Sequence, residues 1–238
     1  MAGKYLRGAF IQFNKSFPLP VPNLILFQYN PETMTHAWTP AKSGGSNASG
    51  QSPSNPLAVT GPPEESFSFN LVMDSNETIA DGDPVTTQLA EVSGVYPRLA
   101  ALEMLLFPVA APAGGLVGAV SAAISSLASV IGVSIATAVP AGNLPVVFFV
   151  WGPGRIAPVR IDQLTITETL YDSVSLVPIH ASAQIGLKVL TKPELQFIDG
   201  PSGTLARAAA VYTTTLREAL AISNLANSTE SIAGMLPF

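Results

Sequence analysis

The sequence predicts an α+β fold that is mainly β, with one short packed helix, an Ala/Ser-rich helical insertion and a C-terminal helix. Three observations support this fold class. Apolar and polar residues alternate over 67–73 and again over 179–189, which is the period of a half-buried strand. Residues 146–151, VVFFVW, form a continuous apolar run, as in a strand buried on both faces. Residues 204–224 instead place Ala, Leu and Arg at helical spacing.

The N-terminal part is predicted to contain strands and one long loop. Residues 5–29 have the apolar content of strands interrupted by three prolines, and Asn30-Pro31 forms a turn at their end. Residues 42–63 are rich in Gly, Ser, Asn and Pro. Because such a segment buries too little apolar surface to offset the entropy of ordering, we expect a mobile loop there.

A tight turn and a short helix are predicted after the strand at 67–73. Residues 81–84, Asp-Gly-Asp-Pro, indicate a turn, because glycine permits positive φ and proline disfavours helical geometry in the residue before it. The helix includes Pro97 in its first turn and ends before Pro108. We expect its apolar face to pack on a sheet; that face consists of Leu99, Leu102 and Leu106.

The longest charge-free part of the chain is residues 104–154. Within it, residues 116–139 are long enough to span a bilayer. Their many Ser, Thr, Gly and Ala residues argue against a membrane span, as does the lack of a flanking Trp/Tyr belt or Lys/Arg asymmetry. We therefore expect a small-residue helical insertion over 108–145, covered by a partner subunit.

The second β region is predicted to contain an irregularity. The alternation of apolar residues changes phase between Ile161 and Leu164. Since a shift of one residue would turn the apolar set to the wrong face, a β-bulge near Asp162–Gln163 is expected. The strand at 179–189 then has one apolar face and one polar, mostly uncharged face. The apolar residues in the second phase are Leu164, Ile166 and Leu170.

The composition favours a subunit of an assembly. Only 11% of the 238 residues are charged, against about 25% in an average soluble domain. A surface poor in charge is weakly solvated and tends to associate, although a low-charge monomer remains the alternative. The net charge of −5, with no basic stripe, argues against a nucleic-acid partner. The absence of cysteine excludes disulfides and thiolate metal sites.

Few residues are suited to catalysis or to ligand binding. His36 and His180 lie in different sequence contexts, and neither adjoins Ser or Asp in a nucleophile-elbow pattern. The only acidic cluster is interpreted as turn residues, because its spacing does not match an EF-hand loop. We therefore predict no catalytic residue, no metal site and no cofactor; a calcium-binding or hydrolytic domain that uses the cluster stays an alternative. The cluster consists of Asp74, Glu77, Asp81 and Asp83.

Five segments, taken in order, resemble one family: the tube-and-hub adaptor proteins of contractile injection systems, the phage-tail-like particles of bacteria. The most specific parts are an aromatic-Gln-aromatic-Asn-Pro-Glu turn, a Gly-Val-Tyr-Pro-Arg-Leu-Ala-Ala-Leu-Glu helix start, and Phe-Val-Trp-Gly followed by Pro-Val-Arg. The resemblance covers most of the chain. The segments are FQYNPETMT (27–35), FSFNLVMDSNETIADGDP (67–84), GVYPRLAALEMLLFP (94–108), VVFFVWGPGRIAPVRIDQLTITETLYD (146–172) and KVLT (188–191).

The resemblance implies two antiparallel sheets forming a tail-tube-like sandwich or barrel over residues 1–191, followed by a helical extension over 192–238. That extension is too short and too helical for the LysM module that several relatives carry. The implied partners are five further copies in a hexameric ring, the neighbouring tube protein, the spike or hub protein and baseplate components. The polar face of 180–188 would line the channel.

The implied location is the bacterial cytoplasm during assembly, since the N-terminus MAGKYLRGAFIQF lacks the apolar core of a signal peptide. A membrane-associated protein anchored through 116–139 remains a second alternative to the adaptor function.

Overall fold

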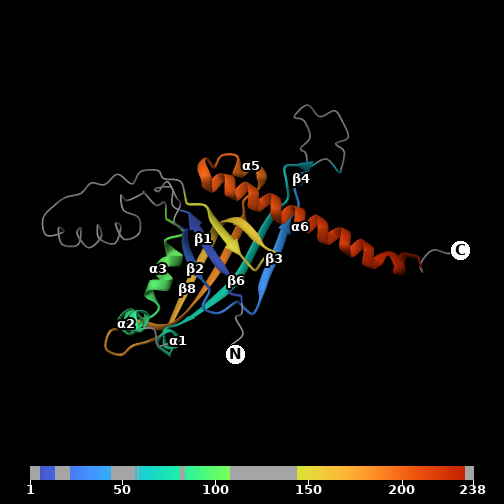
Figure 1. The fold of residues 1–238 in the computed structure, drawn as a ribbon. Helices are drawn as coiled ribbons and strands as arrows, with labels where there is room; N and C mark the ends of the chain where they lie inside the picture. The colour runs from blue at the N-terminus through green and yellow to red at the C-terminus, as the bar shows by residue number, and fades with distance from the viewer. Residues whose placement is uncertain are drawn as a thin grey trace.

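A computed structural model describes residues 6–13, 22–43, 57, 59–80, 84–107 and 144–233. Its central feature is a seven-stranded sheet in the order β2-β1-β7-β8-β9-β6-β3, antiparallel throughout (Figure 1). The strands of this sheet are β1 (Ala9–Phe13), β2 (Pro22–Leu26), β3 (Met34–Thr39), β6 (Glu64–Asp74), β7 (Val147–Val150), β8 (Ile156–Tyr171) and β9 (Pro178–Val189).

The mainly-β fold class is confirmed, but the two predicted sheets are one continuous sheet. Residues 156–159 at the start of β8 pair with β7, and residues 159–171 of the same strand pair with β9. A single long strand thus joins what would otherwise be two sheets, and in the described part of the chain the sheet does not close into a barrel. The edge strands are β2 and β3, which follow each other directly in the sequence.

The expected β-bulge lies in β8. The pairing of β8 with β9 shifts register between Ile161 and Gln163, at the position where the apolar alternation changes phase. The predicted strand at 179–189 is also confirmed, because β9 buries every second residue. Its buried face consists of Ala181, Ala183, Ile185 and Leu187.

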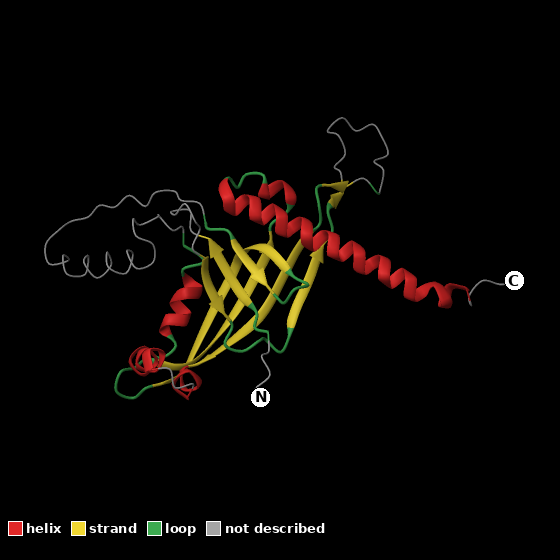
Figure 2. Cartoon of the chain, in the orientation of Figure 1, coloured by secondary structure: helices red, strands yellow, loops and turns green. Residues whose placement is uncertain are grey.

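An aromatic core fills the concave side of the sheet. Phe10 on β1 and Phe69 on β6 have ring centroids 6.4 Å apart, although four strand-to-strand steps separate β1 from β6 in the sheet. The sheet must therefore curl strongly, as Figure 2 shows. Helix α3 (Tyr96–Glu103) packs on this core through Leu99 and Leu102, as predicted, while Leu106 beyond its end is partly buried.

A second, smaller core lies on the opposite side of β7. Val147 and Phe149 face the aromatic core, whereas Val146 and Phe148 contact the C-terminal helices. This two-sided burial explains the continuous apolar run at 146–151 and confirms that prediction. The helices on this side are α5 (Lys192–Leu195) and α6 (Gly200–Ala233). They contribute Leu195, Ala206 and Ala209.

The helices are more numerous and longer than predicted. Helices α1 (Ser75–Ala80) and α2 (Pro84–Ser93) precede α3, so one short packed helix was an underestimate. Pro84 opens a helix instead of only ending a turn, because the first helical turn tolerates a residue without an N–H. Helix α6 extends past the predicted range 204–224 at both ends, and its C-terminal part projects beyond the sheet (Figure 1).

Several predictions fall wholly or partly outside the described residues. The ends of the predicted mobile loop at 42–63 pair as a short ladder of β4 (Lys42–Ser43) with β5 (Val59–Thr60), and most of the residues between them are not described. Residues 81–83 and nearly all of the 108–145 insertion, including 116–139, are also outside. Within the described ranges, no helix is long and apolar enough to cross a membrane.

Candidate functional site

One candidate surface is an uncharged polar face that crosses four strands. On β3, β6, β9 and β8, the residues that alternate with the buried apolar set point to the opposite face of the sheet. There they line a shallow hollow without an Asp, Glu, Lys or Arg. We call this surface the polar band; it consists of Thr35, Ser68, Asn70, Thr165, Thr167, Ser182 and Gln184.

Strand register aligns the polar band into rows. Asn70 on β6 lies opposite Gln184 on β9, which in turn lies opposite Thr165 on β8. In the neighbouring row, Ser182 lies opposite Thr167. Hydroxyl and amide groups therefore form a continuous patch across the strands. Such groups hydrogen-bond water readily but attract a passing charge only weakly.

Charged residues lie beyond both ends of the polar band. At one end, Lys188 Nζ is 3.0 Å from Glu64 Oε1, and Arg160 Nη2 is 2.8 Å from Asp162 Oδ1. At the other end, His180 lies on β9 opposite Asp74 on β6. The uncharged character thus belongs to the middle of the strands.

Residues 27–30, FQYN, connect the segment after the edge strand β2 to strand β6, near the opposite edge of the sheet. The Gln28 side chain is buried, and its Nε2 donates to the carbonyl oxygen of Asp74 at 2.7 Å, while the Asp74 N–H donates to Gln28 Oε1 at 3.0 Å. Gln28 thereby pairs with the β6 backbone as a strand residue would. The same Nε2 donates to Glu77 Oε2 at 2.7 Å. This clamp holds the segment after β2 against the junction of β6 and α1.

Asn30 adds a second clamp in the same turn. Its Oδ1 accepts from the Gly8 N–H at 2.8 Å, and its Nδ2 donates to the Leu6 carbonyl at 2.8 Å. A Cβ on Gly8 would lie only 2.6 Å from the Phe27 ring, so this close approach requires glycine. The aromatic-Gln-aromatic-Asn-Pro-Glu motif, one of those on which the family resemblance rests, therefore has a structural role: its Gln28 and Asn30 side chains hold this turn in place.

Two members of the acidic cluster are engaged by this turn. The Tyr29 hydroxyl donates to Glu77, which raises the pKa of Tyr29 to about 12. The same hydrogen bond, together with that from Gln28, lowers the pKa of Glu77. Asp74 Oδ1 accepts from the Asn76 N–H at 2.8 Å. Asp81 and Asp83 lie outside the described residues, among which no group of three His, Asp or Glu side chains is placed to hold a metal ion.

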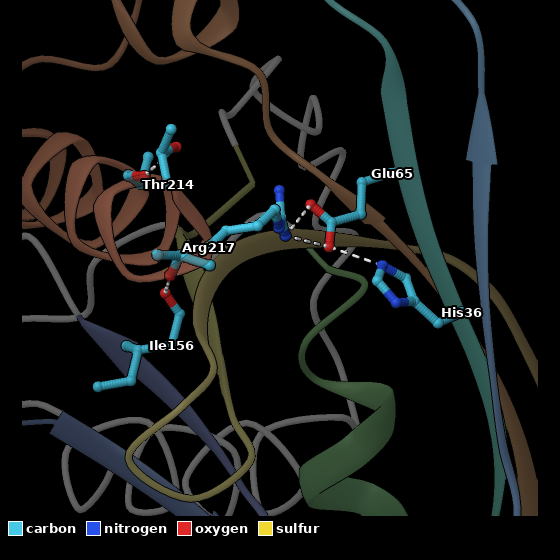
Figure 3. A network of polar contacts seen from close by, with 7 residues as sticks. His36, Glu65, Ile156, Thr214 and Arg217 are labelled. Carbon is cyan, nitrogen blue, oxygen red and sulfur yellow. Dashed lines mark hydrogen bonds and ion pairs between the residues drawn. The ribbon is translucent and has the colours of Figure 1, made fainter. Parts of the chain in front are cut away.

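A buried carboxylate links the sheet to α6. Glu65 on β6 is 8% exposed, and its Oε1 lies 2.8 Å from His36 Nε2 on β3 and 2.9 Å from Arg217 Nη2 on α6 (Figure 3). The Arg217 guanidinium also lies over the Trp38 ring, 4.6 Å from its centroid. Strands β3 and β6 and helix α6 therefore meet at one carboxyl group.

Hydroxyl groups of α6 complete the attachment of the helix. Thr213 Oγ1 donates to the Ile156 carbonyl at the start of β8 at 2.9 Å, and the Tyr212 hydroxyl donates to the Pro153 carbonyl at 2.9 Å. Thr214 Oγ1 donates back within the helix, to the Ala210 carbonyl (Figure 3). These contacts fix the part of α6 that crosses the sheet.

The two histidines make different contacts. His36 lies on the edge strand β3, where its ring stacks on Phe67 with the ring centroids 4.5 Å apart. His180 lies on β9, as expected for the polar face, and its Nδ1 is 2.9 Å from Thr169 Oγ1. The structure does not bring the two together, since they lie on strands separated by β6.

Sequence reasoning missed the residues that organise these contacts. Glu65 shares the phase of Phe67 and Phe69 in the alternating strand, and a glutamate in an apolar phase is a signal for a paired, buried carboxylate. Arg217 carried no comparable signal, because helix-surface arginines are common. Gln28 was part of a motif whose function became evident only from its contacts.

Comparison with known proteins adds no relative to this picture. No protein-family model matches the chain. No curated protein matches it either. The polar band, the sheet edges and the sequence motifs of the chain itself are therefore what bear on its function.

Proposed function

We propose that this chain is a structural adaptor subunit of a contractile injection system, which forms a hexameric ring and joins the inner tube to the spike hub. The observation that carries the proposal is the polar band on β3, β6, β9 and β8. It is broad, solvent-facing and free of charge, and a curved sheet with strands of 11, 16 and 12 residues supports it.

An uncharged polar surface suits the wall of a channel through which cargo passes. Apolar walls would hold protein cargo by burying its surface, and charged walls would hold cargo of opposite sign. Hydroxyl and amide groups remain hydrated and exchange water partners at little cost. In the proposed ring, the polar band of each subunit lines the channel and the aromatic core lies behind it.

The edges of the sheet support assembly with further copies. In the described part of the chain, neither β2 nor β3 pairs with another strand on its outer side. Leu24 and Leu26 on β2 are about half exposed. An unpaired, apolar edge strand invites pairing with another chain, and a closed ring removes such edges without leaving a free patch.

No observation favours the alternatives. The segment required for a membrane anchor, 116–139, lies outside the described residues. Calcium binding would need the oxygens of Asp74 and Glu77, which already accept hydrogen bonds from Asn76, Gln28 and Tyr29.

Electron microscopy with the proteins encoded beside this chain tests the proposal. We expect rings of six copies at the junction of tube and spike, with the polar band towards the channel. Leu24→Lys combined with Leu26→Lys should prevent ring closure while the subunit still folds, because lysine on an edge strand opposes strand pairing. Leu205→Lys, at a similarly exposed leucine on α6, is the control. A wild-type monomer that binds neither tube nor hub protein would contradict the proposal.

A further inference from the structure

The connection between β8 and β9 exposes a group of apolar side chains. Residues 170–176, which we call the tip, have the sequence LYDSVSL. Leu170, Val174 and Leu176 are 65%, 91% and 71% exposed. Three branched apolar side chains within seven residues of one hairpin connection form a patch of the kind that binds another surface.

The tip is braced from within. Asp172 Oδ2 accepts three hydrogen bonds: from the Val174 N–H at 3.1 Å, and from the Ser175 N–H and Oγ, each at 2.7 Å. The Asp172 N–H donates to the Val177 carbonyl at 2.9 Å, and the Leu176 N–H donates to the Asp172 carbonyl at 3.0 Å. The apolar side chains are therefore presented by an ordered turn, so little ordering entropy would be lost on binding.

The backbone of the tip is strained at two leucines. Leu170 has a φ of 58° and Leu176 a φ of 55°, both in the left-handed region that favours glycine or asparagine. A glycine at either place would relieve the strain but remove an exposed apolar side chain. Strain that persists with a larger side chain is a feature of functional sites.

A groove of complementary character lies at the other end of the same two strands. Helix α6, the start of β8 and the end of β9 enclose a hollow of about 290 Å³ with predominantly apolar walls. We call it the α6 groove. Its apolar lining includes Trp38, Pro62, Pro63, Ala157, Pro158 and Val189.

Tip and groove cannot meet within one copy. Strand β8 starts at Ile156 beside the α6 groove and ends at the tip at Tyr171, and β9 returns antiparallel beside it. At about 3.3 Å per residue, up to roughly 50 Å of strand lies between the two surfaces. Two copies placed head to tail bring the tip of one to the groove of the other.

Charges favour this pairing as well. Asp172 in the tip and Glu168 just before it are negatively charged, and neither forms an ion pair with another described residue. Lys192 lines the α6 groove and likewise has no ion-pair partner in the described ranges. An acidic tip would thus approach a groove whose wall carries an unpaired cation.

We propose that the tip of one copy docks in the α6 groove of a second copy of this chain. The contact is heterologous, so it repeats along the strand direction and builds a stack. It uses the Trp38 side chain of β3 but not the unpaired backbone edges of β2 and β3, which are assigned to ring closure. The inference therefore goes beyond the proposed function: rings would stack on rings of the same chain, and even a subunit that formed no ring would associate end to end.

Sedimentation velocity over a concentration series tests the contact. The wild-type chain should form a series of oligomers of increasing size, which we call the ladder, and the larger oligomers should become more abundant as the concentration rises. Val174→Asp should abolish the ladder by placing a charge in the apolar groove, and Val174→Ser should weaken it. Val211→Asp, at an exposed valine on α6 outside the groove lining, is the matched control and should leave the ladder unchanged. Unchanged thermal unfolding verifies that each variant folds.

Mixing two blocked variants gives the decisive measurement. Pro62→Glu blocks the groove with a charge that repels the tip, so neither Pro62→Glu nor Val174→Asp should extend alone. Their mixture should form a pair of assembly units and nothing longer, because one partner keeps a tip and the other a groove. Three outcomes would each overturn the proposal. In the first, the wild-type chain forms no ladder; in the second, Val174→Asp and Val211→Asp weaken the ladder equally. The third outcome is a tip that binds only the tube or hub protein.

The outcome separates this inference from ring formation. Electron microscopy of Val174→Asp should show single, unstacked rings if both the ring proposal and the stacking contact are correct. Rings that stack despite Val174→Asp would overturn only the tip contact. A ladder of single subunits without rings would support the tip contact and contradict the ring.

Discussion

Arg217 on α6 donates from Nη2 to both carboxylate oxygens of Glu65 on β6, at 2.9 and 3.2 Å, across 152 residues of sequence. Glu65 is almost fully buried, whereas the side chain of Arg217 is 46% exposed. A carboxylate in that position needs a partner, because an unpaired buried charge is costly. The pair therefore makes the position of α6 part of the stability of the sheet.

Arg217→Ala should destabilise the protein by about 1–3 kcal/mol. The loss is smaller than the roughly 3–5 kcal/mol for a fully buried pair, because solvent screens the half-exposed arginine. Arg160→Ala is the matched control: its ion pair with Asp162 is about half exposed on both sides and should contribute at most about 1 kcal/mol. Urea unfolding of both variants measures the difference. Equal losses would mean that Glu65 does not depend on α6.

Gln28→Ala should destabilise the protein by about 1–3 kcal/mol, because the Asp74 N–H would lose its partner in a partly buried position. Gln196→Ala, at an exposed glutamine beyond α5, should change the free energy of unfolding by less than about 0.5 kcal/mol. Chemical denaturation compares the two. Hydrogen exchange at the end of β6 should be faster in Gln28→Ala alone; protected amides there would show that the clamp is dispensable.

The two faces of β9 should respond differently to substitution. Ile185 is 0% exposed, so Ile185→Asp should prevent folding, since an unpaired buried charge costs several kcal/mol. Lys188→Ser should leave the fold intact and cost at most about 1 kcal/mol, because its partner Glu64 is largely exposed. Circular dichroism and thermal unfolding check both variants. If the Ile185→Asp protein were soluble and folded cooperatively, it would contradict the assignment of Ile185 to the buried face of β9.

Regular alternation made the long strands predictable from sequence. The period of two in β6 and β9 reflects burial of one face, and the phase change at Ile161 required the bulge found beside Gln163. The run at 146–151 predicted burial on both faces because no residue in it could face water at low cost. In each case the local pattern of apolar and polar residues indicates directly which side chains are buried.

The rest depended on contacts between distant residues. The sequence of β8 does not indicate that this strand pairs with β7 on one side and β9 on the other. Two sheets were therefore predicted where the structure has one. Helices α1 and α2 were missed because residues typical of turns, such as Ser75 and Asn76 in α1 and Pro84 in α2, are also common at the starts of helices. The link from Glu65 to Arg217 arises only when α6 crosses the sheet. Leu170 was expected in the apolar phase with Leu164 and Ile166; it lies near the end of β8, where it is exposed and has a positive φ.

The tip should lose its order only in acid. Hydrogen bonds from the Ser175 hydroxyl, then from the Ser175 and Val174 N–H groups, lower the pKa of Asp172. Since the folded-state pKa is below the unfolded value of about 3.9, the stabilisation is fully present above that value and is lost as the pH falls through the folded-state pKa. Amide exchange of Val174 and Ser175 should therefore show constant protection from neutral pH to about pH 4, and reduced protection below it.

Asp172→Asn isolates this titration. The asparagine side chain offers one acceptor oxygen and carries no charge, so its protection should be weaker at neutral pH and should no longer change in acid. Because a turn that is already loose presents Val174 and Leu176 less firmly, Asp172→Asn should also shorten the head-to-tail ladder at neutral pH. A wild-type tip whose protection falls between pH 7 and pH 5 would contradict the assignment, since a carboxylate with a lowered pKa does not titrate there.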